Sequence, residues 1–128
     1  MRATMAIVVS GMLLCTVSCT ATSRTQADPL SKIELNLHAI GPDGLRGPAD
    51  GKVAVSYEFA IPNTEECRAQ VRAIDPTVQF MPGSQGRIGA PKSGCLCIGS
   101  THHPAYRDVL RRLAELPYVE RIVECYFE

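Results

Sequence analysis

The strongest constraint on the fold of this chain is a strand–helix–strand pattern that occurs twice after residue 52. Apolar side chains fall at every second position in residues 53–61, which is typical of a half-buried strand. Helical spacing then replaces this alternation, and the same change occurs again further along the chain. The predicted elements are strands at residues 53–61, 77–81, 95–98 and 118–127, with helices at residues 63–74 and 103–116.

Both predicted helices carry start and stop signals. Asn63 or Thr64 can cap the first helix, and the proline of Asp75-Pro76 stops it. Pro104 suits the first position of the second helix, which ends at Pro117. The apolar faces of these elements predict one core, made of Val55, Tyr57, Phe59, Val71, Ile74, Leu110, Leu113 and Val123.

Residues 32–40 also alternate between apolar and polar side chains, which predicts an additional strand before the repeated pattern. A glycine- and proline-rich loop, residues 41–51, follows it. The element order resembles the ferredoxin-like βαββαβ arrangement. The expected fold is therefore α+β, ferredoxin-like with an extra N-terminal strand, and with helices on one face of a mixed or antiparallel sheet. The extra strand can add to a sheet edge or form a hairpin with residues 53–61.

In this arrangement we expect the strands at residues 53–61 and 95–98 to run parallel. The turn at residues 99–103 and the turn at residues 61–64 would then lie at the same end of the sheet. Connecting loops on a rigid scaffold often carry function. This end is therefore the expected functional end of the domain, with the glycine-rich loop around Arg87 as a second contributor.

The N-terminus reads as an export signal. Arg2 precedes a short apolar run at residues 5–14, which is too short to span a bilayer and has the length of a signal-peptide core. The run ends in Thr16-Val17-Ser18-Cys19, which resembles the lipobox of bacterial lipoproteins, although Thr16 stands where that pattern has a leucine-like residue. The resemblance covers residues 1–19 and implies that Cys19 is acylated and becomes the new N-terminus.

Two alternatives to lipidation stay open. One is ordinary cleavage after Thr25-Gln26-Ala27 or Cys19-Thr20-Ala21, and the other is an uncleaved anchor. The expected organisation is a signal at residues 1–19, a flexible polar tether at 20–31 and a single α+β domain at 32–128. The expected location is across the bacterial inner membrane, membrane-anchored or else periplasmic or secreted.

Charge and composition narrow the class of partner. The chain carries 13 basic and 13 acidic residues and no tryptophan, so it has neither an electrostatic footprint nor an aromatic platform for nucleic acid. The expected partners are the membrane, through the lipid anchor, and an envelope protein or small ligand.

Four cysteines remain once the signal is removed: Cys67, Cys95, Cys97 and Cys125. In an oxidising compartment an even set favours disulfides. Strand and helix placement favours Cys67–Cys97, with Cys95–Cys125 as the second pair. The alternative is a zinc or copper site formed by Cys95, Cys97, His102 and His103, because two thiolates and two imidazoles are ligands of these metals.

The turn from strand to helix at Ser100, Thr101, His102 and His103 is the candidate ligand site, with Arg87 as an added positive charge. Backbone N–H groups there can bind an anion. Ser100 and His102 lack the glycine-flanked setting of a catalytic serine, so no catalytic residue and no cofactor are predicted. The sequence therefore favours a non-catalytic binding or structural protein of the cell envelope. A metal-binding or redox accessory protein is the alternative.

Overall fold

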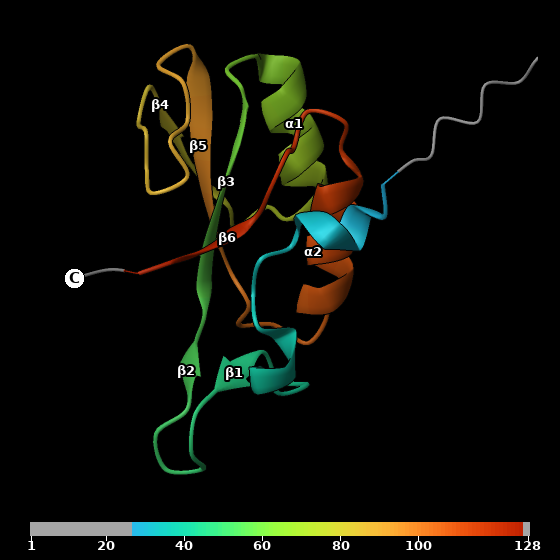
Figure 1. Cartoon of the computed structure of the whole chain (residues 1–128), viewed down its shortest axis with the longest axis vertical. Coiled ribbons are helices and arrows are strands. Elements are labelled where there is room, and N and C mark those ends of the chain that lie inside the picture. The colour runs from blue at the N-terminus through green and yellow to red at the C-terminus, as the bar shows by residue number, and fades with distance from the viewer. Residues whose placement is uncertain (1–26, 127–128) are drawn as a thin grey trace, which may run out of the picture.

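The computed structural model describes residues 27–126. This part of the chain is a mixed α+β structure with two α-helices and two antiparallel sheets (Figure 1). The larger sheet has the strand order β4-β5-β3-β6, and the smaller sheet pairs β1 with β2. The elements are η1 (Pro29–Lys32), η2 (Leu37–Ala39), β1 (Leu45–Arg46), β2 (Val53–Ala54), β3 (Ser56–Pro62), α1 (Glu65–Ile74), β4 (Gln79–Pro82), β5 (Gly94–Ser100), α2 (Tyr106–Glu115) and β6 (Val123–Cys125).

The two α-helices lie on one face of the four-stranded sheet (Figure 1). The start of α1 is as expected, because the Thr64 side chain accepts a hydrogen bond from the backbone N–H of Cys67. The helix ends at Asp75, before Pro76. In α2, which follows Pro104, one face is buried against the sheet and α1, and it consists of Tyr106, Val109, Leu110, Leu113 and Ala114.

The core lies between the helices and the sheet. Tyr57, Phe59 and Ile61 alternate along β3 with their side chains on the helix face, and all three are buried. Six of the eight predicted core residues belong to this cluster, and Ile74 packs against it while only partly buried. Val123 was expected in the core, and this expectation is wrong. It pairs with Glu58, whose side chain lies on the opposite face of the sheet.

The strands β3 and β5 run antiparallel, which corrects the expected parallel pairing. The crossover through α1 returns β4 in the direction of β3, and β5 then turns back beside β4. Ser56 is opposite Ser100, whereas Pro62 is opposite Gly94. The turn that follows Ser100 and the turn that follows Pro62 therefore lie at opposite ends of the sheet, so one functional end cannot contain both.

The expected strand at residues 32–40 is not formed. The segment begins at the last residue of η1 and contains η2, which is closed by local backbone bonds such as Ile40 N–H to Leu37 O at 3.3 Å. Only single bridges remain, a parallel one between Ile33 and Ile122 and an antiparallel one between Ile40 and Arg46. The guanidinium of Arg107 donates to the carbonyl of Leu37. The segment is therefore held by α2 as well as by the chain before β6.

The loop between β4 and β5 folds over the sheet face opposite to the helices (Figure 1). Its Ile88 N–H donates a 2.7 Å hydrogen bond to the carboxylate of Glu58, which is 2% exposed. Gly86 approaches the same face with a positive φ, and a Cβ there would lie within 2.8 Å of Leu96 and Glu58. Glycine at this position thus allows the loop to lie close over the sheet.

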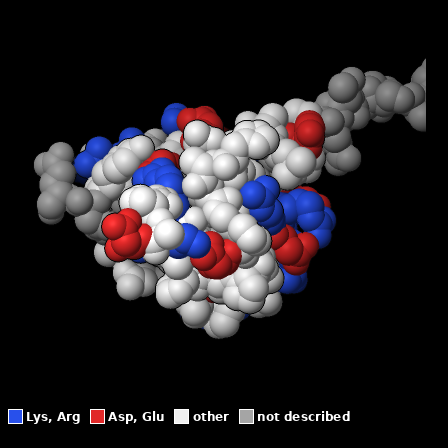
Figure 2. All heavy atoms as spheres, turned by 90° about the horizontal axis from the view of Figure 1, so that it is seen from below, with Lys and Arg blue, Asp and Glu red and all other residues white. Residues whose placement is uncertain are grey.

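Surface charges are mixed. On the end of the molecule that carries β1 and β2, basic and acidic side chains are interspersed (Figure 2). Several form ion pairs, including Arg46–Glu124 at 2.7 Å and Lys52–Asp43 at 3.1 Å. Within residues 27–126, no helix has the length and hydropathy needed to cross a membrane. The predicted signal, Cys19 and the tether up to residue 26 lie outside the described residues.

Candidate functional site

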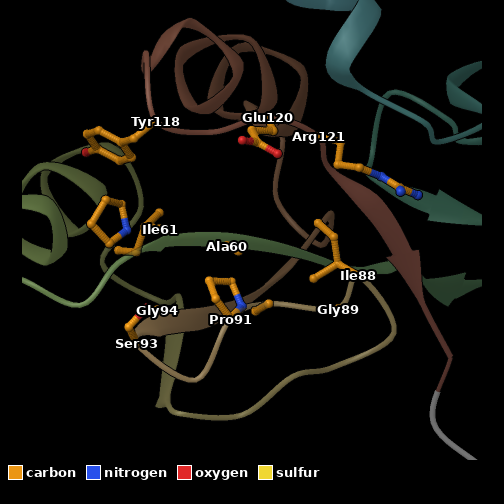
Figure 3. A pocket seen from close by; sticks show the side chains of 12 residues that line it. Ala60, Ile61, Ile88, Gly89, Pro91, Ser93, Gly94, Tyr118, Glu120 and Arg121 are labelled. Atoms are coloured by element: carbon orange, nitrogen blue, oxygen red, sulfur yellow. The ribbon is translucent and has the colours of Figure 1, made fainter.

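The larger of two notable cavities opens where β6 leaves the side of β3. We call it the edge groove, and its volume is about 450 Å³. Ala60 lies at its centre, between Tyr118, Glu120 and Arg121 on one side and the loop before β5 on the other (Figure 3). The lining residues are Ala60, Ile61, Pro62, Ile88, Gly89, Ala90, Pro91, Ser93, Gly94, Tyr118, Glu120 and Arg121.

The backbone of Ala60 faces this groove. The carbonyl of Val55 accepts a 2.9 Å hydrogen bond from Thr101 N–H, so the odd-numbered residues of β3 direct their backbone groups toward β5. The even-numbered residues then face β6, and Ser56 and Glu58 are paired there with Cys125 and Val123. The ladder stops at Glu58. Among the described residues, Ala60 has no backbone partner on this side.

The chain before β6 is drawn away from β3 by other bonds. Ile122 directs its backbone outward, where its N–H donates to Lys32 O and its carbonyl accepts from Glu34 N–H, both at 2.8 Å. Arg121 forms a 3.1 Å ion pair with Glu34 in the same segment. The N-terminal segment therefore holds residues 121–122 apart from Ala60, and this separation creates the edge groove.

Tyr118 forms one wall of the edge groove and donates a 2.5 Å hydrogen bond to Gln70 of α1. Burial, together with smaller contributions from the thiols of Cys67 and Cys97, raises the pKa of Tyr118 to about 12. The phenol is therefore neutral near pH 7. The groove presents apolar surface, the neutral phenol of Tyr118, the charged side chains of Glu120 and Arg121, and unpaired backbone.

A smaller cavity of about 270 Å³ lies at the other end of the sheet, near the C-terminal end of α1. We call it the Asp75 cavity, and its lining residues are Ile74, Asp75, Pro76, Thr77, Ser100, His102, His103 and Val109. Asp75 is 3% exposed, and its Oδ1 accepts hydrogen bonds from both the N–H and the hydroxyl of Thr77. Its Oδ2 is buried without a partner among the described residues.

The four residues of the candidate ligand turn do not all lie at one site. Ser100, His102 and His103 do line one cavity, the Asp75 cavity. Thr101 is fully buried instead: its hydroxyl donates to Gly44 O at 2.6 Å and accepts from Val55 N–H at 3.0 Å. This pair of bonds joins the two sheets, so Thr101 has a structural role.

Arg87 does not lie at this turn. Its guanidinium carbon is 5.5 Å from the centre of the ring of Tyr126, the residue that follows β6. Arg87 belongs to the loop that covers the sheet face opposite to the helices, which we call the open face. The reason is the antiparallel pairing of β4 and β5, which places the loop after Pro82 at the end of the sheet opposite to Ser100. The structure therefore does not bring Arg87 together with the two histidines at the Asp75 cavity.

The four cysteines within the described residues are free thiols. Cys95 pairs with Ile61 and Cys125 pairs with Ser56, so their side chains lie on opposite faces of the sheet. The expectation of a second disulfide between Cys95 and Cys125 is therefore wrong. Cys67 packs against the buried cluster that contains Cys97.

The geometry gives the predicted zinc or copper site no support. Within residues 27–126, no three His, Cys, Asp or Glu side chains are grouped to hold a metal ion. Cys95 and Cys97 are buried under the helices, whereas His102 is exposed beyond the strand end. Burial raises the pKa of the Cys97 thiol, and Cys95 contributes to the shift. Cys97 therefore stays protonated, whereas metal binding requires the thiolate.

Sequence reasoning missed the functional candidates Ala60, Tyr57 and Asp75. Tyr57 was expected only as core, although a buried tyrosine hydroxyl usually needs a partner. That hydroxyl is buried and has no partner within the described part of the chain. Asp75 was expected only as a helix stop. The signal that was available is the presence of these two polar groups within apolar elements. The unpaired backbone of Ala60 leaves no trace in the sequence.

Comparison with protein-family models, with curated proteins and with solved structures found no match to this chain. The edge groove and the Asp75 cavity are the two candidate sites of this protein.

Proposed function

We propose that this protein is an exported, lipid-anchored binding module of the bacterial cell envelope, and that it acts by binding another protein rather than by catalysis. The apolar run and the lipobox-like Thr16-Val17-Ser18-Cys19 support export and anchoring. Two acyl signals are needed for stable anchoring, and lipoprotein N-termini that resemble this one carry more than one chain.

The anchoring proposal is tested with Cys19→Ser. The variant is expected to lose incorporation of a labelled fatty acid and to leave the membrane fraction or remain unprocessed. Thr16→Ser, which keeps the cysteine, is the control and should stay anchored. An unmodified native N-terminus at Asp28 would contradict lipidation.

We infer further that the domain has a ferredoxin-like arrangement with an N-terminal addition that is not a strand. Two strand–helix–strand units, β3-α1-β4 and β5-α2-β6, support this inference, as does the strand order β4-β5-β3-β6 with antiparallel neighbours. In such a sheet β3 is central. It becomes an edge only where β6 is shorter than β3, at Ala60.

The observation that carries the binding proposal is the unpaired backbone of Ala60 at the floor of the edge groove. An N–H and a carbonyl without protein partners favour a ligand that supplies both a donor and an acceptor in extended geometry. An extended polypeptide segment does so by strand addition, while the apolar walls receive its side chains. Pro62 has no N–H and ends the edge, so the site accommodates only a short segment.

The residues around the groove agree with binding rather than chemistry. Ile61, Ile88, Pro91 and Tyr118 supply apolar surface. No histidine or cysteine is among the described residues that line it, and its charged side chains are Glu120 and Arg121, of which Arg121 is paired with Glu34. The volume of about 450 Å³ falls in the range of ordinary ligand sites and suits a few side chains of a bound segment.

The test uses a displayed library of random ten-residue peptides, selected on the mature protein and measured by titration calorimetry. The variant Ile88→Glu places a charge in the apolar wall and should reduce affinity of the selected peptides at least about tenfold. Val53→Glu is the matched control, because Val53 is 57% exposed on β2 and lies outside the groove. Equal loss for both variants, or selected peptides that bind Ile88→Glu normally, would refute the groove as the binding site.

A further inference from the structure

The Asp75 cavity contains a polar side chain that the fold leaves incompletely paired. Thr77 supplies two donors to Oδ1 of Asp75, at 2.9 Å and 2.6 Å, and none of the described residues donates to Oδ2. A buried carboxylate oxygen without a donor is costly, because it has lost its bonds to water. A ligand with N–H donors would remove this cost.

The Tyr57 side chain provides a second buried polar atom without a partner among the described residues. The Tyr57 hydroxyl is buried without a partner, and its ring lies directly over Gly99, where a Cβ would be 2.5 Å from the ring. Burial raises the pKa of Tyr57, and the Asp75 charge raises it further. The Tyr57 hydroxyl therefore stays neutral, and the charge of Asp75 contributes to this. Each buried polar atom without a partner in a native structure calls for an explanation.

The walls define the rest of the ligand. Ile74, Pro76 and Val109 supply apolar surface, and Val109 is buried. Nδ1 of His103 accepts a hydrogen bond from the N–H of Ala105, so the neutral ring carries its proton on Nε2. Asp75 is the one acidic residue among the described residues that line the cavity. The cavity is therefore negative at one point and apolar beside it.

A metal ion does not fit this arrangement. Metal binding needs three or more ligands grouped around one point, and none of the residues that the structure describes form such a group. An organic cation needs only one carboxylate and a matching apolar surface.

We propose that the Asp75 cavity binds a small primary ammonium compound, with its ammonium on Oδ2 of Asp75 and its short alkyl chain against Ile74, Pro76 and Val109. This site is independent of the edge groove, which lies at the other end of β3. An ammonium group provides three donors, one of which would satisfy Oδ2.

The experiment titrates the mature protein with n-butylammonium chloride and follows the ¹³Cγ resonance of Asp75 by NMR. The Asp75 resonance should move in a saturable manner, while that of the exposed Asp50 should stay in place. Neutral 1-butanol is the matched probe, and it should bind at least about tenfold more weakly, because it cannot form the charge-assisted bond.

Asp75→Asn keeps an acceptor for Thr77 and removes the charge, so it should abolish the preference for the ammonium over 1-butanol. If this variant fails to fold, the unaltered protein still decides through the two probes. Equal affinity for n-butylammonium and 1-butanol would overturn the proposal. An Asp75 resonance that does not move at the highest soluble concentration would also overturn it, and would mean that ordered water satisfies Oδ2.

Discussion

The carboxylate of Glu58 accepts a 2.7 Å hydrogen bond from the backbone N–H of Ile88, thirty residues further along the chain. This bond holds the β4–β5 loop over the open face of the sheet and gives the edge groove its second wall. It also explains why a carboxylate that is 2% exposed is tolerated there, since a buried charge needs donors.

Glu58→Ala is expected to reduce the free energy of unfolding by about 1.5–3 kcal/mol, the usual value of a hydrogen bond to a charged group. The loop should also become accessible to proteases, because its tie to the sheet is lost. Glu58→Gln keeps an acceptor for Ile88 and should cost less. Urea denaturation and limited proteolysis of the two variants check this, and equal stability of Glu58→Ala and the native protein would contradict it.

Leu110→Ala is expected to reduce stability by about 2–5 kcal/mol, because Leu110 is fully buried where α2 packs on the sheet. Val53→Ala serves as the control. Val53 is exposed, so its change should stay within about 0.5 kcal/mol of zero. A loss below about 0.5 kcal/mol for Leu110→Ala would show that α2 does not pack as described.

The ion pair between Arg46 and Glu124 predicts a pH dependence. The hydrogen bond from Arg46 holds the pKa of Glu124 below its ordinary value, and the proton is bound more weakly in the folded state. The stabilisation is therefore fully present above the unfolded pKa, about 4.3, and is lost as pH falls through the lower folded pKa. Thermal melts from pH 7 to pH 3 should lose less stability in Glu124→Gln than in the native protein. Asp50→Asn, on an exposed loop, should behave like the native protein.

Oxidation of the exported protein is expected to join Cys67 to Cys97. Cys97 belongs to the buried core cluster, and Cys67 packs against this cluster. Such a bridge should add about 2–4 kcal/mol of stability. Intact mass before and after reduction should differ by two hydrogens, and Cys67→Ser should abolish the difference. A bridge that contains Cys125, which lies on the opposite face from Cys95, would contradict the described strand register.

Local patterns in the sequence predicted the elements after residue 52 well. The Thr64 cap, the Asp75-Pro76 stop and the apolar face of α2 each act through neighbouring residues, so they can be read without knowing the fold. The alternation in residues 32–40 misled for the opposite reason. It resembles a strand, but the segment forms no continuous ladder. Ile122 and Arg107 of α2 bind it through a few isolated hydrogen bonds, and local 3₁₀ turns satisfy other backbone groups.

The candidate sites depended on information that the sequence does not carry. Ser100, His102 and His103 line one cavity, as their adjacency in the sequence makes natural, and their role as a ligand site stays a prediction. Asp75 joins them because β3 and β5 run antiparallel, so that α1 returns the chain to the end of the sheet where β5 ends. Arg87 lies elsewhere because it belongs to the β4–β5 loop at the other end. The edge groove arises from where β6 stops pairing with β3, which is a matter of register.

The most direct test of the proposed binding site is amide hydrogen exchange at Glu58 and Ala60, two residues that face the same side of β3. In the free protein, Glu58 is paired with Val123 and should be protected, whereas the Ala60 amide should exchange at least about tenfold faster. Saturation with a peptide selected on the mature protein should then slow exchange at Ala60 to the rate of Glu58. Equal protection of both amides in the free protein, or an Ala60 amide unaffected by the bound peptide, would contradict strand addition at the edge groove.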